Sequence, residues 1–274
     1  MRNFCPTLDA GALRPAHTQA SLANRYILHA VCVASATVAP MTRHVVVTGA
    51  NRGIGRAIAE AFVAAGDTVS TIYRGGDLPA GVDGEIADIT DTDAVNAAFD
   101  ALEERNGRVR VLVANAGITK DGLLMRMTDE DFEQVIDVNL TGTFRTVRRA
   151  VQSMIREKYG RIILVGSVVG LLGNPGQVNY SSSKSALVGM ARSITREVGS
   201  RGITANVIAP GFIETAMTAE LGEELVKQYE ANIPAKRFGS TQEVASAALF
   251  LASDDAGYVS GAVLPVDGGL GMGH

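Results

Sequence analysis

Three side chains near the middle of the sequence have the types and the spacing needed to move a proton to or from an oxygen. Tyr180 and Lys184 are four residues apart, so on a helix they lie on one face, one turn from each other. A free tyrosine has a pKa of ~10, and a neighbouring ammonium is expected to lower it. Ser167 could hold a carbonyl or alcohol oxygen against the phenol if a strand end brought it there. Together these residues predict acid–base chemistry on a C–O group.

A glycine-rich turn far upstream suggests that a hydride moves with this proton. Residues 44–48 read as a buried parallel strand, and Gly49, Gly53 and Gly55 follow it before an amphipathic helix begins. Such a turn can bind a pyrophosphate, because glycine lets the backbone approach and the helix N-terminus points N–H groups at the anion. The spacing T-G-x-x-x-G-x-G differs from the G-x-G-x-x-G of many dehydrogenases. Taken alone, the turn also fits an ordinary α/β domain.

Six motifs, taken in order, carry a resemblance to a known family. They are TGANRGIG, NAG at 115–117, Asn139, Ser167, YSSSK and PGFIET at 210–215. With them, residues 42–274 resemble the classical short-chain dehydrogenase/reductase family. The stretches GITKDGLLMRM, GRIILVGSVVGLLGNPGQVNY, GITANVIAPGFIET and SGAVLPVDGGLGMGH are similar to the 3-oxoacyl-acyl-carrier-protein reductases of bacterial fatty-acid synthesis. Within that group, GMGH and MRMT resemble the long-chain reductases of actinobacterial mycolic-acid pathways.

The resemblance implies a role for each of four residues. Tyr180 donates the proton, Ser167 hydrogen-bonds the same oxygen, and Lys184 lowers the pKa of Tyr180 and binds the nicotinamide ribose. Asn139 anchors a water that relays protons to the lysine. The implied reaction is the NADPH-dependent reduction of a 3-oxoacyl chain carried on acyl carrier protein. The alternative is a related carbonyl reductase that acts on acetoacetyl-CoA or another small ketone.

The resemblance also implies which residues line the cofactor pocket. They belong to the glycine turn, to the segments after the next strands, to the catalytic helix and to the loop after Pro210. These residues are Gly49, Asn51, Arg52, Gly53, Ile54, Gly55, Arg74, Asp88, Ile89, Asn115, Ala116, Gly117, Tyr180, Lys184, Pro210, Gly211, Ile213 and Thr215.

The charge after the second predicted strand favours NADPH as the cofactor. Arg74 stands where NAD enzymes usually place an acid that accepts from the ribose 2′-hydroxyl. Arg52 in the glycine turn can reach the same place, and two arginines suit a 2′-phosphate. Either arginine alone could equally be a solvated surface residue.

The expected partner is an acyl carrier protein, which is acidic and would be steered by basic residues. Lys158 and Arg201 match the carrier-docking positions of the similar reductases, although both could also be solvated cations at helix ends. A mobile lid over the acyl chain is expected from the segment that follows Pro210. Its apolar members are Phe212, Ile213, Met217, Leu221, Leu225 and Tyr229.

Composition excludes several other functions. A formal net charge of −4 and the lack of a basic run argue against nucleic acid as a partner. The sequence contains no apolar span of 18 residues, so no membrane helix is predicted. We expect a cytoplasmic protein. The only cysteines, Cys5 and Cys32, precede the first predicted strand, and the four histidines are scattered, so no metal site is expected.

Residues 1–40 are expected to lie outside the domain and to be poorly ordered. They contain a single acid, Asp9, and three arginines. We favour an extension upstream of a natural start at Met41. An organellar transit peptide is the second interpretation. A secretory signal is ranked last, because export would separate the enzyme from its reduced cofactor.

The alternation of strands and helices predicts one α/β domain, residues 41–274, with a doubly wound, Rossmann-like parallel sheet. Strands are predicted at 45–48, 68–73, 85–87, 109–114, 160–166, 204–209 and 262–266, with long helices at 129–157 and 180–199. By resemblance, we expect a homotetramer that pairs these long helices and abuts the last strands. Val147, Arg148, Arg149 and Val151 would give the first long helix a face suited to that pairing.

Overall fold

A parallel sheet forms the centre of the computed structural model, which describes residues 42–215 and 222–272. Within these residues the sheet has seven strands in the order β3-β2-β1-β4-β5-β6-β7. They are β1 (His44–Thr48), β2 (Thr68–Tyr73), β3 (Val82–Ile86), β4 (Val109–Ala114), β5 (Gly160–Val165), β6 (Ile203–Pro210) and β7 (Val263–Val266). The order reverses between β1 and β4, where a doubly wound sheet opens a crevice for a ligand. The predicted Rossmann-like fold is confirmed.

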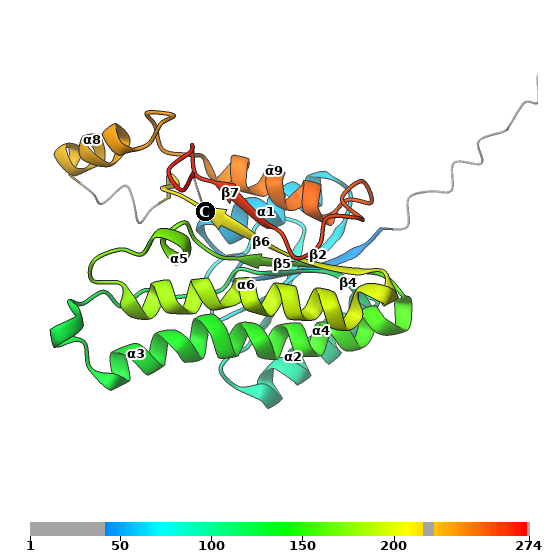
Figure 1. Cartoon of the computed structure of the whole chain (residues 1–274). Helices are drawn as coiled ribbons and strands as arrows, with labels where there is room; N and C mark the ends of the chain where they lie inside the picture. Colours follow the sequence, from blue (N-terminus) through cyan, green and yellow to red (C-terminus); the bar gives the residue numbers. More distant parts are fainter. Residues whose placement is uncertain (1–41, 216–221, 273–274) are drawn as a thin grey trace, which may run out of the picture. The chain divides into compact units, whose positions relative to one another are not determined.

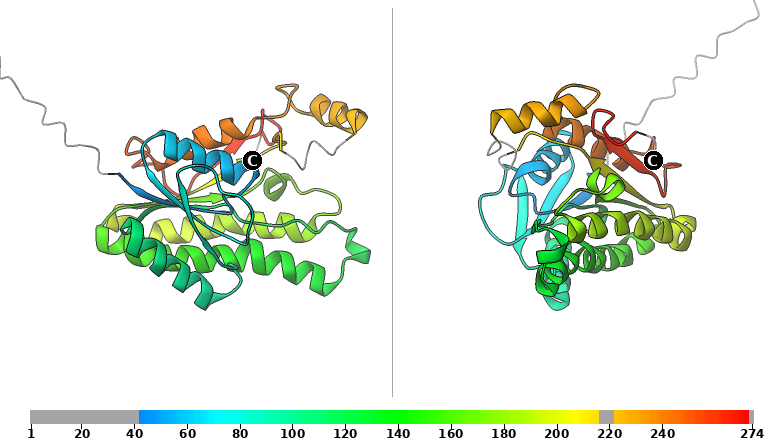
Figure 2. Two further views of the ribbon diagram at one scale, coloured as in Figure 1. Left: turned by 180° about the vertical axis from the view of Figure 1, so that it is seen from behind. Right: turned by 60° about the vertical axis from the view of Figure 1, so that its left-hand side comes forward.

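Helices cover both faces of the sheet (Figures 1 and 2). The helices α2 (Thr92–Asn106), α4 (Thr143–Glu157) and α6 (Val178–Val198) lie on one face, and α1 (Gly53–Ala64) and α9 (Thr241–Ala252) lie on the other. Shorter helices are α3 (Asp129–Ile136), α5 (Val169–Leu172) and α8 (Glu223–Asn232). In β1, Val46 packs on the α4 side while Val45 and Val47 pack on the α1 side. Burial on both faces explains why this strand is a continuous apolar run.

Two predicted boundaries were wrong for different reasons. The strand predicted at 85–87 is β3, and it begins three residues earlier, where Val82 pairs with Val69. β3 is an edge strand with Asp83 and Glu85 in it, so an apolar run did not mark its start. The helix predicted at 129–157 is α3 and α4 joined by a π-helical turn over Asp137–Gly142, which a 3.6-residue periodicity does not reveal.

Residues 1–40, and Met217 and Leu221 of the expected lid, lie outside the described residues, so the predictions for them are not tested. None of the helices in the described parts combines the length and the apolar character that a membrane crossing requires.

Two of the four residues expected on an exposed face of α4 point into the subunit instead. Val147 lies in the core, and the Arg149 guanidinium pairs with Asp100 at 2.6 Å and Glu103 at 2.7 Å, both in α2. These two side chains therefore stabilise helix packing within one chain. The outward face is formed by Arg148 and the exposed apolar side chains Phe144 and Ile155, and Arg148 lies over the Phe144 ring at 5.1 Å.

His44 is a buried titratable group at the start of β1. Its Nδ1 lies 2.6 Å from the Gly107 carbonyl oxygen, and its Nε2 lies 2.6 Å from the Ser70 hydroxyl. A carbonyl can only accept, so Nδ1 carries the proton and Nε2 accepts from Ser70 in the neutral ring. Burial lowers the pKa of His44 below its ordinary value of 6.5, against the opposing influence of the Gly107 carbonyl.

His44 should therefore make stability depend on pH. Because its folded pKa lies below the unfolded one, its contribution is complete above the unfolded pKa and is lost as the pH falls from there toward the folded pKa. The matched variant is His44→Gln, which cannot titrate. In urea unfolding between about pH 7.5 and pH 5, the stability gap between wild type and variant should narrow as the pH falls. A gap that stays constant across this range would contradict the assignment.

Candidate active site

Hydrogen bonds to one threonine join the ends of β1 and β4 at the carboxyl edge of the sheet. Thr48 ends β1, and its Oγ1 accepts from the backbone N–H groups of Asn115 and Ala116, both at 3.0 Å. The Asn115 side chain donates back to the Thr48 carbonyl at 3.0 Å. Two predicted cofactor residues are thereby fixed beside the glycine turn, at the edge where ligands bind in such sheets.

The glycine turn has the backbone conformation that a phosphate site needs. Gly49 and Gly53 have φ values of +71° and +54°, which favour glycine. A Cβ on Gly55 would lie 2.4 Å from both the Gly49 carbonyl oxygen and the Asn115 side-chain nitrogen. Arg52 precedes α1 without capping it through its side chain. The first N–H groups of α1 are thus left for an anion, and the turn fits a dinucleotide pyrophosphate.

The two arginines proposed for a 2′-phosphate lie on this side of the site and are exposed. Arg74 reaches Asp88 only loosely, at 4.0 Å. The Asp88 carboxylate is held mainly by the backbone and hydroxyl of Thr90, whose hydrogen bonds lower its pKa, and Arg74 lowers it further. The Asn51 side chain donates to the Gly75 carbonyl at 3.0 Å, which ties the glycine turn to the segment that carries Arg74.

Other predicted cofactor residues differ in how accessible their side chains are to a ligand. Ile89 is almost fully buried and packs on Gly142 of the π-helical turn, so little of its side chain is left to face an adenine. Thr215 lies beside the glycine turn, because a Cβ on Gly53 would meet its methyl group at 3.9 Å. Pro210 ends β6, and its carbonyl accepts from Val168 N at 2.9 Å.

Ser167 and Tyr180 come together at the carboxyl end of β5. The Ser167 side chain is near enough to the phenol to act on the pKa of Tyr180, and Val169 N donates to Ser167 Oγ at 3.2 Å. We expected Lys184 to lower the pKa of Tyr180, but here the pKa is raised. Burial of the phenol is the largest cause, the Ser167 hydrogen bond opposes it, and the charge of Asp121 adds to it. The raised pKa keeps the phenol protonated at neutral pH, which suits an acid.

Lys184 lies one turn after Tyr180 and is nearly inaccessible, with 5% of its surface exposed. Its Nζ donates to the carbonyl of Val165, the last residue of β5, at 2.8 Å, and lies 5.7 Å from the centre of the Tyr180 ring. Burial lowers the pKa of Lys184 to about 8. Gly117 lies beside this group, because a Cβ there would lie 3.1 Å from Asn139 Oδ1 and 3.4 Å from Lys184 Nζ.

Asn139 lies inside the π-helical turn and is fully buried. Its Oδ1 accepts from Ile118 N at 2.8 Å, and its Nδ2 donates to Ile118 O at 2.9 Å and to Ser183 Oγ at 3.1 Å. The side chain is thus committed to protein partners. A relay water of the kind implied by the resemblance would have to bind the Asn139 carbonyl, which also accepts from Thr143 Oγ1 at 2.8 Å.

Two polar residues next to this group were missed by our sequence reasoning. Asn179 and Ser183 are both fully buried and lie four residues apart on α6, one position before Tyr180 and Lys184 respectively. Their spacing could have been a signal, since a buried Asn and Ser at one helical face need partners.

The predicted docking residues lie far from the reacting groups. Lys158 follows the C-terminus of α4, and Arg201 ends the 3₁₀ turn after α6. They are close to each other, since a Cβ on Gly202 would meet the Lys158 carbonyl at 2.6 Å. Tyr180 lies in the first turn of α6, so Arg201 is ~30 Å away along the helix axis. Figure 1 shows the two ends of α6 at opposite ends of the sheet.

An aromatic stack joins the start of the expected lid, just after β6, to α8 (Glu223–Asn232) and to Phe238. The Phe212 ring stacks on Tyr229 of α8 at 4.4 Å and on Phe238 at 5.5 Å, while Ile213 is buried and Leu225 is partly exposed. Whether this segment moves over a substrate stays a prediction.

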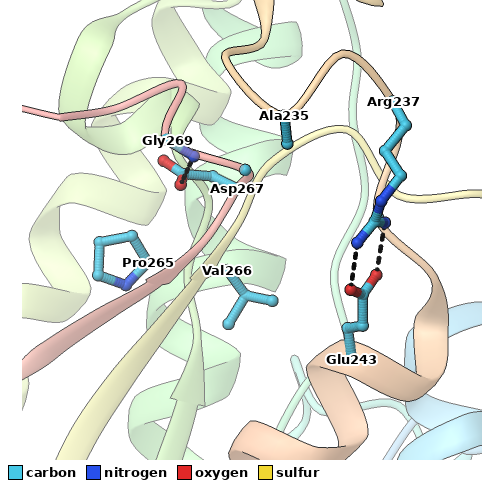
Figure 3. Close-up of a pocket in the computed structure, with 9 residues that line it drawn as sticks. Ala235, Arg237, Glu243, Pro265, Val266, Asp267 and Gly269 are labelled. Carbon is cyan, nitrogen blue, oxygen red and sulfur yellow. Dashed lines mark hydrogen bonds and ion pairs between the residues drawn. The ribbon is translucent and has the colours of Figure 1, made fainter.

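A pocket near the C-terminal loop offers no reacting group (Figure 3). Arg237 is paired with Glu243 at 2.6 and 2.9 Å, and Asp267 accepts from the N–H groups of Gly269 and Gly271. Its charges are therefore satisfied within the protein. Across the described part of the chain, no three His, Cys, Asp or Glu side chains are grouped to hold a metal ion.

A family model described as enoyl-(acyl carrier protein) reductase matches residues 49–271. The chain belongs to the short-chain dehydrogenase/reductase family. It is 54% identical over 234 residues to the 3-oxoacyl-acyl-carrier-protein reductase MabA of Mycobacterium tuberculosis, covering 85% of this chain and 95% of that protein. It is 46% identical over 234 residues to the 3-oxoacyl-acyl-carrier-protein reductase FabG of Escherichia coli, covering 82% of this chain and 96% of that protein.

Proposed function

We propose that this short-chain dehydrogenase/reductase uses NADPH to reduce 3-oxoacyl chains on acyl carrier protein to 3-hydroxyacyl chains. The observation that carries the proposal is that Ser167 and Tyr180 come together beside the buried Lys184, whose Nζ donates to the last residue of β5, at the sheet edge that also carries the glycine turn. Two neighbouring hydroxyls can both donate to the oxygen of a substrate, which suits a carbonyl group. The names of the similar reductases support the 3-oxoacyl substrate.

The residues at the sheet edge fit a dinucleotide. The uncapped start of α1 and the close approach allowed by Gly55 would hold the pyrophosphate, and Arg52 and Arg74 would hold a 2′-phosphate. When bound, the reduced cofactor supplies a hydride to the ketone carbon. Because such an enzyme draws on the reduced nicotinamide pool of the cell, we place it in the cytoplasm.

The chain's own residues supply and guide the proton. As the substrate oxygen gains negative charge, Ser167 donates a hydrogen bond to it and Tyr180 transfers its proton to it. The raised pKa of Tyr180 keeps that proton in place beforehand. The Lys184 ammonium, 5.7 Å from the ring centre, stabilises the phenolate that is left behind.

Tyr180→Phe tests the proposed acid. The ring keeps its packing, so NADPH binding should survive in a fluorescence titration, while turnover should fall by at least ~10²-fold, the lower end for lost acid–base catalysis. Substantial residual turnover would mean that the proton comes from another group.

With the wild type, kcat/KM should be higher for a 3-oxoacyl carrier substrate than for acetoacetyl-CoA, an unrelated ketone or an enoyl thioester. A preference for one of the last three would replace the proposed substrate class.

Replacing both Arg52 and Arg74 by alanine tests the choice of cofactor. Each charged hydrogen bond to phosphate should contribute ~1.5–3 kcal/mol, so NADPH binding should weaken strongly while NADH binding hardly changes. Arg56→Ala is the matched control, because that exposed arginine pairs with Glu60 at 2.9 Å within α1. Equal losses for NADPH and NADH would show that the two arginines are structural.

We also propose a homotetramer in which a carrier bound to one subunit delivers its chain to another. Lys158 and Arg201 lie ~30 Å from Tyr180 of the same chain, at the far end of α6. If α4 and α6 pair across a two-fold axis, the end of one α6 lies beside the start of the other. The exposed Phe144 and Ile155 of α4 support such pairing, as does β7, which pairs with β6 on one side and is the last strand of the described sheet on the other.

Mixed assemblies test delivery between subunits. A Tyr180→Phe chain has no acid, and a Lys158→Glu/Arg201→Glu chain should bind the carrier poorly. When the two variants are co-expressed, their turnover of the carrier substrate should exceed the sum of their separate activities several-fold. The reason is that a carrier bound to the intact basic surface of the Tyr180→Phe chain can deliver to the intact active site of the other chain. As a control, a chain with all three changes should give no such gain when paired with either variant. No gain in the first mixture would contradict delivery between subunits.

A further inference from the structure

The peptide groups on both sides of Tyr180 are bonded to the segment that follows β4. In the first turn of α6, Tyr180 N has no helical partner, and Gln177 at the N-cap gives no side-chain hydrogen bond. Asn179 Oδ1 accepts from Tyr180 N at 2.7 Å, and its Nδ2 donates to Lys120 O at 2.9 Å. One amide therefore links the backbone of Tyr180 to the segment after β4.

The carbonyl of Tyr180 is linked to the same segment by a second route. Ser183 Oγ donates to Tyr180 O at 2.7 Å and accepts from Asn139 Nδ2 at 3.1 Å. Asn139 in turn binds both backbone groups of Ile118, at 2.8 and 2.9 Å. Asn139, Asn179 and Ser183 are all fully buried. Their hydrogen bonds are shielded from water, so each is costly to lose.

A third contact extends this frame to α3. Asn179 Nδ2 also donates to the Asp131 carbonyl at 3.2 Å, and the Asp131 carboxylate pairs with the Lys120 ammonium at 2.6 Å. On the other side, Gly122 N donates to Gly176 O at 2.8 Å, just before α6. The segment between β4 and α3 is thus held against the start of α6 at several points, and Asn179 occupies the buried centre.

We infer that Asn179 and Ser183 are positioning residues that hold the backbone of Tyr180 in register with the segment after β4. The inference rests on the proposed function, because it assigns Tyr180 as the acid. The Ile118–Lys120 segment continues directly from Asn115 to Gly117, the predicted cofactor residues. The frame therefore sets the phenol relative to the cofactor side of the site, where a small displacement is costly to the reaction.

The test compares these two residues with a buried asparagine elsewhere. Asn206 lies within β6, is also buried, and binds two backbone groups, Val259 O at 2.8 Å and Ala262 N at 3.0 Å. Asn179→Leu, Ser183→Ala and Ser183→Thr are prepared with Asn206→Leu as the control. Urea unfolding, NADPH affinity, kcat, KM and the solvent deuterium isotope effect on kcat are measured for each, with the best ketone substrate of the wild type.

Asn179→Leu and Ser183→Ala should lower kcat by roughly 10- to 100-fold, change KM little and raise the solvent isotope effect, because proton transfer from a displaced phenol becomes limiting. Ser183→Thr keeps the hydroxyl and should recover most of kcat. Asn206→Leu should lower the stability in urea but leave kcat, KM and the solvent isotope effect near their wild-type values. If Asn179→Leu does not fold, Ser183→Ala carries the test.

The inference is overturned if Ser183→Ala and the folded Asn179 variant lose only stability, as Asn206→Leu does, while Tyr180→Phe is inactive. If Tyr180→Phe itself keeps its activity, it is the proposed function that fails, and the two outcomes are therefore distinguishable.

Discussion

A buried ammonium fastens the catalytic helix to the edge of the sheet, and the rest of the site depends on it. Lys184 Nζ donates to the carbonyl of Val165, the last residue of β5, in a nearly inaccessible position. Burying a cation with a carbonyl as its partner is unfavourable, and the pKa of Lys184 falls to about 8 as a result. The bond nevertheless brings the start of α6 to the end of β5. Tyr180, one turn earlier, is consequently held near the end of β5, which Ser167 follows by two residues.

Much of this arrangement could be predicted from the sequence because burial leaves a direct mark on it. The valines of β1 and the apolar runs of β4 and β5 reflect strands covered on both faces. The glycines of the turn mark a positive φ and a close backbone contact, which few other residues permit. The four-residue spacing of Tyr180 and Lys184 fixes their relative position once the helix is assumed.

Features that depend on distance in space or on solvent could not be predicted in this way. The helix predicted at 180–199 already separates Arg201 from Tyr180, but only the fold shows that Lys158 lies beside Arg201 at the far end of that helix. The expected lowering of the Tyr180 pKa counted the neighbouring charge but not the burial of the phenol, which is the larger influence. The spacing of Asn179 and Ser183 indicates at most a polar helix face, because two of the three backbone partners of Asn179, the carbonyls of Lys120 and Asp131, are distant in sequence.

The most direct measurement follows the hydride to its destination. The wild-type enzyme is incubated with a 3-oxoacyl carrier substrate and NADPH deuterated at the transferable position of the nicotinamide, and the acyl chain is analysed by mass spectrometry and NMR. We predict a 3-hydroxyacyl chain with deuterium on the carbon that bears the new hydroxyl, because the hydride goes to the ketone carbon and the proton to its oxygen. An unreduced carbonyl, or deuterium at any other carbon, would contradict the account.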